Sequence, residues 1–263
     1  MIYDFYLFQG HGGVDAGACA NGYKELDVAY EVAEGVYKLL KNTFKIHRNT
    51  KQQNNYTNNL LLGNSYTGKF GITIHVNAGG GNGTECLVPC NESYFKIENN
   101  ILNKFSGFGF SNRGIKSRSY NTEQFYKRQE GKKINDTDYY KEIRQAWNLG
   151  VSGTILELFF IDCKTDLEKY NKYKTDMIYA IANAILEYYN KPLLTKPVSK
   201  PVSKPVTTNT TSYRVIAGSF KNKDNANKQA EKLKKLGIDC FVEKRWTIKG
   251  YILYPFFMYY DIM

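Results

Sequence analysis

A proline repeat divides this chain into two parts that have to fold separately. The tetrapeptide Lys-Pro-Val-Ser recurs from Lys196 to Val206. Proline has no backbone N–H and disfavours helical geometry at the residue before it, so this stretch should be extended and polyproline-like. We therefore expect a linker over residues 192–211, between a larger domain at 1–191 and a smaller region at 212–263.

Strand-like and helix-like patterns alternate before the linker. This alternation predicts an α/β domain with a mostly parallel twisted sheet and helices on both faces. After the linker, a helical pattern at 225–236 lies between strand-like segments, which predicts a small α+β region. Whether that region is complete stays open, since only about 50 residues follow Ser212. In the larger domain the strand-like runs include 2–8, 70–76, 84–88 and 153–160, and the helix-like runs are 24–41, 92–108, 139–149 and 166–190.

Positive charge is concentrated after the larger domain. The formal net charge is +11, and residues 192–263 hold 13 basic against 5 acidic residues. Such a region suits a polyanionic partner, either nucleic acid or an anionic bacterial wall. Lys228, Lys232 and Lys235 stand at helical spacing, which is equally typical of a solvated surface helix. We expect the wall and no nucleic acid.

Neither end of the chain predicts membrane insertion. Apolar stretches are shorter than the roughly 20 residues that a spanning helix requires. Residues 1–8 lack the basic and long apolar segments of a signal peptide, so we expect synthesis in the cytoplasm of the bacterial host without a leader. The aromatic tail at 251–263 indicates self-association through the C-terminal region or burial against a neighbour.

Two histidines and one glutamate stand where a metal site could form. His11 lies in a glycine-rich loop after the first strand, Glu25 begins the next helix, and His75 ends a later strand. The carboxyl ends of strands are where α/β sheets bind ligands. A His, Glu, His set leaves one zinc position open, as catalytic sites require. Either histidine alone would more often be structural. We assign no ligand role to His47, the third histidine.

Glu157 places a single carboxylate inside the apolar strand at 153–160. An unpaired buried charge is costly, so this carboxylate needs a partner or a role. A functional role would be that of a general base, which takes a proton from water and returns it to a leaving amine. The alternative is a structural glutamate in a salt bridge with a basic neighbour.

These residues lie in segments that resemble the zinc-dependent N-acetylmuramoyl-L-alanine amidases of the AmiC-like type, the amidase 3 family. The resemblance implies that His11, Glu25 and His75 hold zinc, with Glu157 as the catalytic acid and base. It also implies cleavage of the amide between N-acetylmuramic acid and L-alanine of the peptidoglycan stem peptide. The matching segments within residues 2–190 are Gly10–Ala18, Glu25, Ile74–Ala78, Gly83–Glu85, Asn112–Lys116 and Leu156–Ile161.

The segment Tyr213–Phe220 and the helix-like run after it resemble the start of a SPOR domain, a module that binds glycan strands lacking stem peptides. We therefore expect a peptidoglycan hydrolase whose partners are glycan strands and stem peptides. Without a leader it would be a phage or prophage endolysin, and a bacterial autolysin or sporulation amidase is the alternative. Two other functions stay open: a non-catalytic wall-binding protein, and a zinc peptidase that acts on stem peptides.

Overall fold

The structure is a computed structural model that describes residues 1–54, 59–196 and 222–235. It divides into two units, Met1–Pro197 and Val198–Met263. In the second unit the described part contains helix α5 (Lys223–Lys235), which confirms the helix predicted there. The rest of the linker repeat after Lys196, the strand-like segments beside α5 and the aromatic tail at 251–263 lie outside the described residues.

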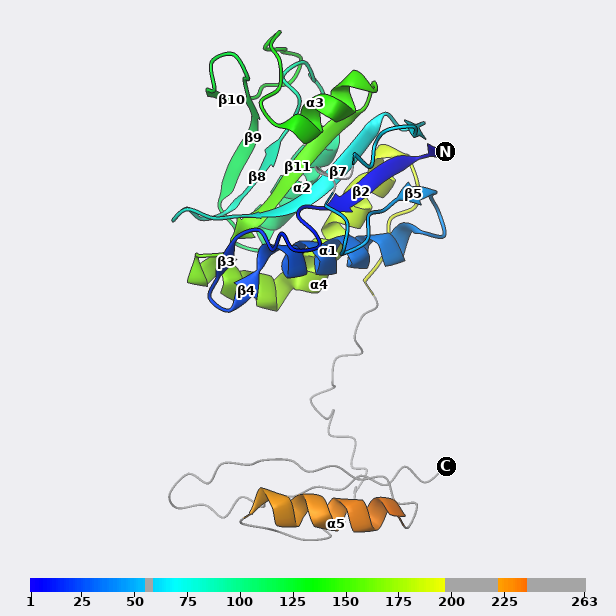
Figure 1. The fold of residues 1–263 in the computed structure, drawn as a ribbon, viewed down its shortest axis with the longest axis vertical. Coiled ribbons are helices and arrows are strands. Elements are labelled where there is room, and N and C mark those ends of the chain that lie inside the picture. The colour runs from blue at the N-terminus through cyan, green and yellow to red at the C-terminus, as the bar shows by residue number, and fades with distance from the viewer. Residues whose placement is uncertain (55–58, 197–221, 236–263) are drawn as a thin grey trace, which may run out of the picture. The chain divides into compact units, whose positions relative to one another are not determined.

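A seven-stranded mixed sheet forms the centre of the first unit (Figure 1). Four of its six neighbouring pairs are parallel, which confirms the mostly parallel sheet predicted from the sequence. The antiparallel pairs are β10 with β9 and β11 with β8. In sheet order the strands are β10 (Phe125–Lys127), β9 (Asn112–Arg118), β8 (Thr84–Leu87), β11 (Ser152–Phe160), β7 (Phe70–Asn77), β2 (Phe5–Gln9) and β5 (Ile46–His47).

Two short ribbons accompany the sheet. Strand β1 (Ile2–Tyr3) pairs with β6 (Ser65–Tyr66). Strand β3 (Cys19–Ala20) pairs with β4 (Tyr23–Lys24), immediately before the first helix.

Helices cover both faces of the sheet, as predicted. Helices α1 (Glu25–Leu40), α2 (Lys96–Gly107) and α4 (Lys164–Tyr188) share one buried core with the sheet. Helix α3 (Lys141–Asn148) packs on the opposite face, as Figure 1 shows. Alternation along β2 separates the two layers, because Phe5 and Leu7 enter the first core while Tyr6 and Phe8 face α3.

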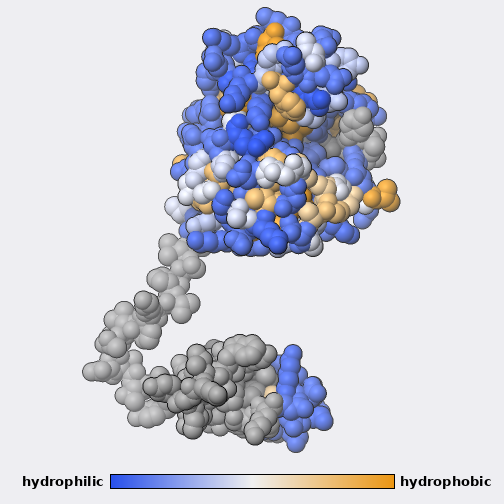
Figure 2. Space-filling model, turned by 90° about the vertical axis from the view of Figure 1, so that its left-hand side faces the viewer, coloured by the Kyte–Doolittle hydropathy of each residue, from blue (hydrophilic) through white to orange (hydrophobic). Residues whose placement is uncertain are grey.

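The surface is mainly polar on the face shown in Figure 2, where hydrophobic side chains are visible in small patches between hydrophilic ones. Among the described helices, none is both long and apolar enough to span a membrane.

Strands β9 and β10 were not predicted from the sequence, because their residues lack an apolar strand pattern. In β9, Ile115 and Ser117 face inward, and Ser117 donates a hydrogen bond to the carbonyl of Val88. Arg113 and Lys116 of the same strand reach the carboxylate of Glu85 on β8. Pairing across strands thus compensates for the polar residues of β9, and it depends on neighbours distant in sequence.

Asp166 connects three elements beside the sheet. Its side chain is fully buried in the first turn of α4. It accepts hydrogen bonds from the backbone N–H of Gly83 at 2.6 Å and of Phe160 at 3.3 Å, and it pairs with Lys169 at 3.3 Å. The start of β8 and the end of β11 are therefore held to the same carboxylate.

Replacing Asp166 with alanine should lower the free energy of unfolding by about 2–3 kcal/mol, because buried N–H groups lose their acceptor. Urea unfolding followed by circular dichroism would measure the change. The control is Asp176→Ala on the same helix, which removes a more exposed pair with Lys196 and should cost about 0–1 kcal/mol. Equal costs for the two variants would contradict the connecting role of Asp166.

Candidate metal and catalytic site

The sheet register sets His75 and Glu157 side by side. His75 on β7 is the parallel partner of Glu157 on β11, and Glu157 is also the antiparallel partner of Glu85 on β8. Their neighbours Ile74 and Leu156 point into the core shared with α1, α2 and α4. Because side chains alternate along a strand, His75 and Glu157 face the side of α3. His75 lies near the carboxyl end of β7, as predicted, and Glu157 lies within β11.

A tight loop carries His11 to this edge of the sheet. The N–H of Gly10 donates to the carbonyl of Ile74 at 2.7 Å, which ties the loop to β7. His11 then adopts a left-handed backbone conformation with φ of 62°. Such a conformation is uncommon for a residue other than glycine, although histidine adopts it more often than most. The imidazole centroids of His11 and His75 come within 5.2 Å of each other.

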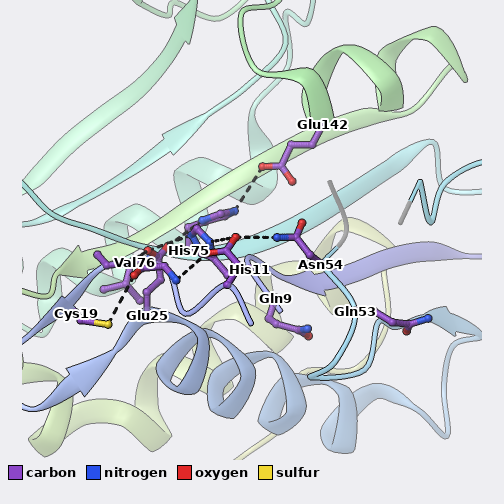
Figure 3. Close-up of polar contacts among 12 residues, drawn as sticks. Gln9, His11, Cys19, Glu25, Gln53, Asn54, His75, Val76 and Glu142 are labelled. Atoms are coloured by element: carbon purple, nitrogen blue, oxygen red, sulfur yellow. Dashed lines mark hydrogen bonds and ion pairs between the residues drawn. The ribbon is translucent and has the colours of Figure 1, made fainter. Parts of the chain in front are cut away.

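Glu25 joins the two histidines at the first position of α1 (Figure 3). One carboxylate oxygen lies 3.2 Å from Nε2 of His11, and the other lies 2.9 Å from Nδ1 of His75. The same oxygens accept hydrogen bonds from the backbone N–H of Ala18 at 2.9 Å and of Val76 at 3.1 Å. Ligand atoms of His11, Glu25 and His75 all lie within 4.8 Å of one another, so these three residues could hold a metal ion.

Two further residues orient His11. Its Nδ1 lies 2.9 Å from a carboxylate oxygen of Asp15, and Asn54 donates to that same oxygen at 2.8 Å. Asp15 therefore fixes the imidazole so that Nε2 faces Glu25. Metal-binding histidines commonly have such a carboxylate on their second nitrogen. Figure 3 shows Asn54 extending toward this group.

The charges in this cluster stabilise one another. Burial opposes ionisation of Glu25, but the hydrogen bonds from His11 and His75 outweigh it and hold the pKa of Glu25 well below its usual value. Burial likewise opposes a charge on His75, whereas Glu142 and Glu25 raise its pKa well above the ordinary value. Glu142 approaches Nε2 of His75 at 3.5 Å. A metal would have to displace protons from these nitrogens in order to bind.

Glu157 lies beside this cluster, and its carboxyl group can be ionised or protonated near neutral pH. Burial raises its pKa to about 7, the charge of His75 opposes that rise, and the nearby glutamates add to it. Among the described residues, Oε2 of Glu157 has no hydrogen-bond partner. Arg113 and Lys116 pair with Glu85 instead, so the basic neighbours that a structural Glu157 would need are engaged elsewhere.

The donor set fits a divalent metal such as zinc. Two imidazoles and one carboxylate are typical ligands of catalytic zinc sites. Two glycines leave room for them: a Cβ on Gly10 would lie 2.2 Å from the His75 ring, and one on Gly17 would lie 2.6 Å from both Glu25 and His11. A cavity of about 270 Å³ opens onto the histidines, and Asp15, Tyr140 and Glu142 also line it.

His47 lies outside this cluster. Its Nδ1 is 2.6 Å from the hydroxyl of Tyr66, and its ring stacks on Tyr3. Burial, together with the positive charge of the N-terminus, lowers the pKa of His47 to about 4. The residue is therefore a neutral member of an aromatic cluster.

Sequence reasoning brought out the four residues of the centre but not those around it. Asp15 had a signal, since it stands four residues after His11 in the same glycine-rich segment. Asn54 and Glu142 had none, because their places depend on how a distant loop and α3 pack against the sheet. Glu85 and Arg113 were part of matching segments, without an assigned role.

Family models match most of this chain. One described as N-acetylmuramoyl-L-alanine amidase matches residues 6–187, and one described as SPOR domain matches residues 193–244. The SPOR match begins within the expected linker and includes the proline repeat.

Two curated relatives are similar to the chain. A sporulation-specific N-acetylmuramoyl-L-alanine amidase of Bacillus subtilis (strain 168) is 24% identical over 250 residues, which cover 90% of this chain and 83% of that protein. The N-acetylmuramoyl-L-alanine amidase CwlM of Bacillus licheniformis is 33% identical over 85 residues, 30% of this chain and 34% of that protein.

Solved structures share the fold. An N-acetylmuramoyl-L-alanine amidase from Clostridium difficile 630 superposes with a TM-score of 0.51 at 15% identity, over 71% of this chain and 96% of that chain. The CwlD amidase of Clostridioides difficile gives 0.52 at 14% identity, over 71% and 98%. At these identities the likeness concerns the fold alone.

Adding one methyl group at Gly17 should weaken metal binding at least tenfold, because its Cβ would press on two candidate ligands. The affinity for Co²⁺, followed by its visible absorption, would measure this. Gly22→Ala is the matched control, because Gly22 also has a positive φ, of 80° against 65°, but nothing lies within 4 Å of its Cβ position. Equal affinities in Gly17→Ala and Gly22→Ala would contradict the proposed site.

Proposed function

The chain belongs to the N-acetylmuramoyl-L-alanine amidase family and cleaves the amide between N-acetylmuramic acid and L-alanine in peptidoglycan, and we propose that a zinc ion takes part in this reaction. His11, Glu25 and His75 would hold the ion. The proposal rests mainly on the Glu25 carboxylate, which contacts both histidines, so that one ligand atom of each of the three residues lies within 4.8 Å of the others. Zinc in such a site polarises a carbonyl oxygen and makes water nucleophilic near neutral pH.

Glu157 would move the proton. It lies next to His75 across the sheet, with one carboxylate oxygen that has no hydrogen-bond partner among the described residues. As a base it takes a proton from the attacking water. As an acid it then gives this proton to the nitrogen of L-alanine as the carbon–nitrogen bond breaks. A pKa raised to about 7 by burial suits both steps, since both protonation states are populated near neutral pH.

Asp15 and Asn54 support this chemistry because they orient the imidazole of His11. Asp15 hydrogen-bonds to Nδ1 of His11 and fixes which of its nitrogens faces Glu25, and Asn54 holds Asp15 in place by donating to the same carboxylate oxygen. The products are a muramic acid with a free lactyl carboxylate and a stem peptide with a free L-alanine amino group. The oxygen and one hydrogen of water end on the former, and the other hydrogen ends on the latter.

The SPOR domain binds peptidoglycan, and we propose that its ligand is glycan from which stem peptides have been removed. That glycan is the product of the amidase reaction, so the module would keep the enzyme on wall that it has already processed. The basic residues of this region suit an anionic wall.

Two biological settings are open to such an enzyme. One is lysis of a host cell by an endolysin, and the other is wall remodelling by a bacterial enzyme. The similarity to a sporulation-specific amidase over 90% of the chain supports the second.

Replacing Glu157 with glutamine should leave zinc content and peptidoglycan binding unchanged while lowering turnover about 10²–10⁴-fold, the usual contribution of general acid–base catalysis. Release of stem peptides from purified wall, quantified by mass spectrometry, would measure turnover. Glu168→Gln on the exposed side of α4 is the control and should keep full activity. Normal turnover in Glu157→Gln would refute the proposed role of this residue.

A further inference from the structure

A second cavity of about 400 Å³ opens beside Glu157. Glu157, Glu85, Arg113 and Phe160 line it, whereas His11 and His75 line the first cavity. Tyr140 lines both cavities, so the two adjoin at its side chain. The centre therefore has two openings with different linings, one beside the candidate metal ligands and one beside the general acid.

The position of Glu157 indicates which part of the substrate enters which cavity. The general acid has to reach the leaving nitrogen, which belongs to L-alanine. Glu157 lines the second cavity and is absent from the lining of the first. The peptide side of the scissile amide therefore extends into the second cavity, and the muramic acid side lies toward the histidines.

At one end of the second cavity, Arg113 belongs to a charge cluster around Glu85. Glu85 accepts from Nε of Arg113 at 2.7 Å, from Nζ of Lys116 at 2.5 Å and from the amide of Asn77 at 3.1 Å. Two cations thus converge on one carboxylate. Since a single negative charge compensates only one of them, the cluster can accept a second anion.

Arg113 is positioned to bind that anion. Its guanidinium carbon stands 4.8 Å from the centre of the Phe160 ring, which limits its orientation. Among the described residues, Nε is the guanidinium nitrogen that donates a hydrogen bond, and its partner is Glu85. The side chain is 34% exposed, so its terminal nitrogens are reachable from the cavity. A guanidinium binds carboxylates through two parallel hydrogen bonds.

We propose that Arg113 binds a carboxylate of the stem peptide beyond L-alanine and makes the enzyme prefer substrates that carry this negative charge. The proposal rests on the proposed function. Stem peptides contain two carboxylates that could serve, the α-carboxylate of a γ-linked D-glutamate at the second position and the carboxylate at the peptide's C-terminus.

Three synthetic substrates distinguish these sources: the muramoyl tripeptide L-Ala–γ-D-Glu–L-Lys, its α-amide at the second residue, and its C-terminal amide. For the full-length zinc-loaded enzyme we expect one of the two amides to lose about tenfold or more in kcat/KM, mainly through KM. The amide that loses activity identifies the carboxylate that is bound. Equal kcat/KM on all three substrates would overturn the proposal.

Arg113→Gln should lower kcat/KM for the acid substrate to the value found for the disfavoured amide, and kcat/KM for that amide should stay unchanged. Arg113→Lys should recover part of the preference. Lys127→Gln is the control, since it removes a positive charge from an exposed position of the neighbouring strand β10 that does not line the cavity, and it should keep the preference. An equal loss on all three substrates in Arg113→Gln would mean that Arg113 is merely structural.

Binding of the three tripeptides to the Glu157→Gln protein, measured by calorimetry, separates this inference from the proposed function. If the acid binds more tightly than one of the amides, and Arg113→Gln removes this difference, the inference is supported. This holds even if the wild-type enzyme cleaves none of the substrates, because the lack of cleavage would refute only the proposed function. Equal binding of acid and amides would overturn the inference even if all are cleaved.

Discussion

The Glu25 carboxylate is the contact on which the architecture of the site depends. Its two oxygens contact His11 and His75 and also accept two backbone hydrogen bonds, one from the loop after β2 and one from β7. The start of α1, the His11 loop and the central strand are thereby fixed to one group. Because four donors meet two oxygens, a shift of any one element would leave a buried polar group unsatisfied.

The pairing of strands in the sheet also determines the geometry of the site. Pairing across β7, β11 and β8 places His75, Glu157 and Glu85 in one row on the face that α3 covers. Along this row, the candidate residues for metal binding, proton transfer and substrate binding occupy different positions. The candidate metal ligands lie at one end, Glu157, the proposed proton carrier, lies in the middle, and the cluster with Arg113 lies at the other end, where the second cavity opens.

How far sequence predicts this site depends on the range of the forces involved. The loop with His11, the helix start at Glu25 and the strand with His75 have local signals, and Glu157 is conspicuous because an apolar strand rarely contains a carboxylate. Strand β9 was not predicted, because the charges of Arg113 and Lys116 are compensated by Glu85 on a neighbouring strand that is distant in sequence. Asn54 and Glu142 reach the site through tertiary packing, and no local pattern in the sequence indicates such long-range contacts.

We propose that a metal held by His11, Glu25 and His75 drives hydrolysis of the amide between muramic acid and L-alanine. Mass spectrometry of purified peptidoglycan after digestion, with and without a chelator, tests it most directly. We expect intact stem peptides with a free L-alanine amino group, no release with the chelator, and recovery of release when zinc is restored. Peptide fragments with the lactyl amide intact would indicate a peptidase, unchanged wall would indicate a binding protein, and release that persists with the chelator would refute the metal site.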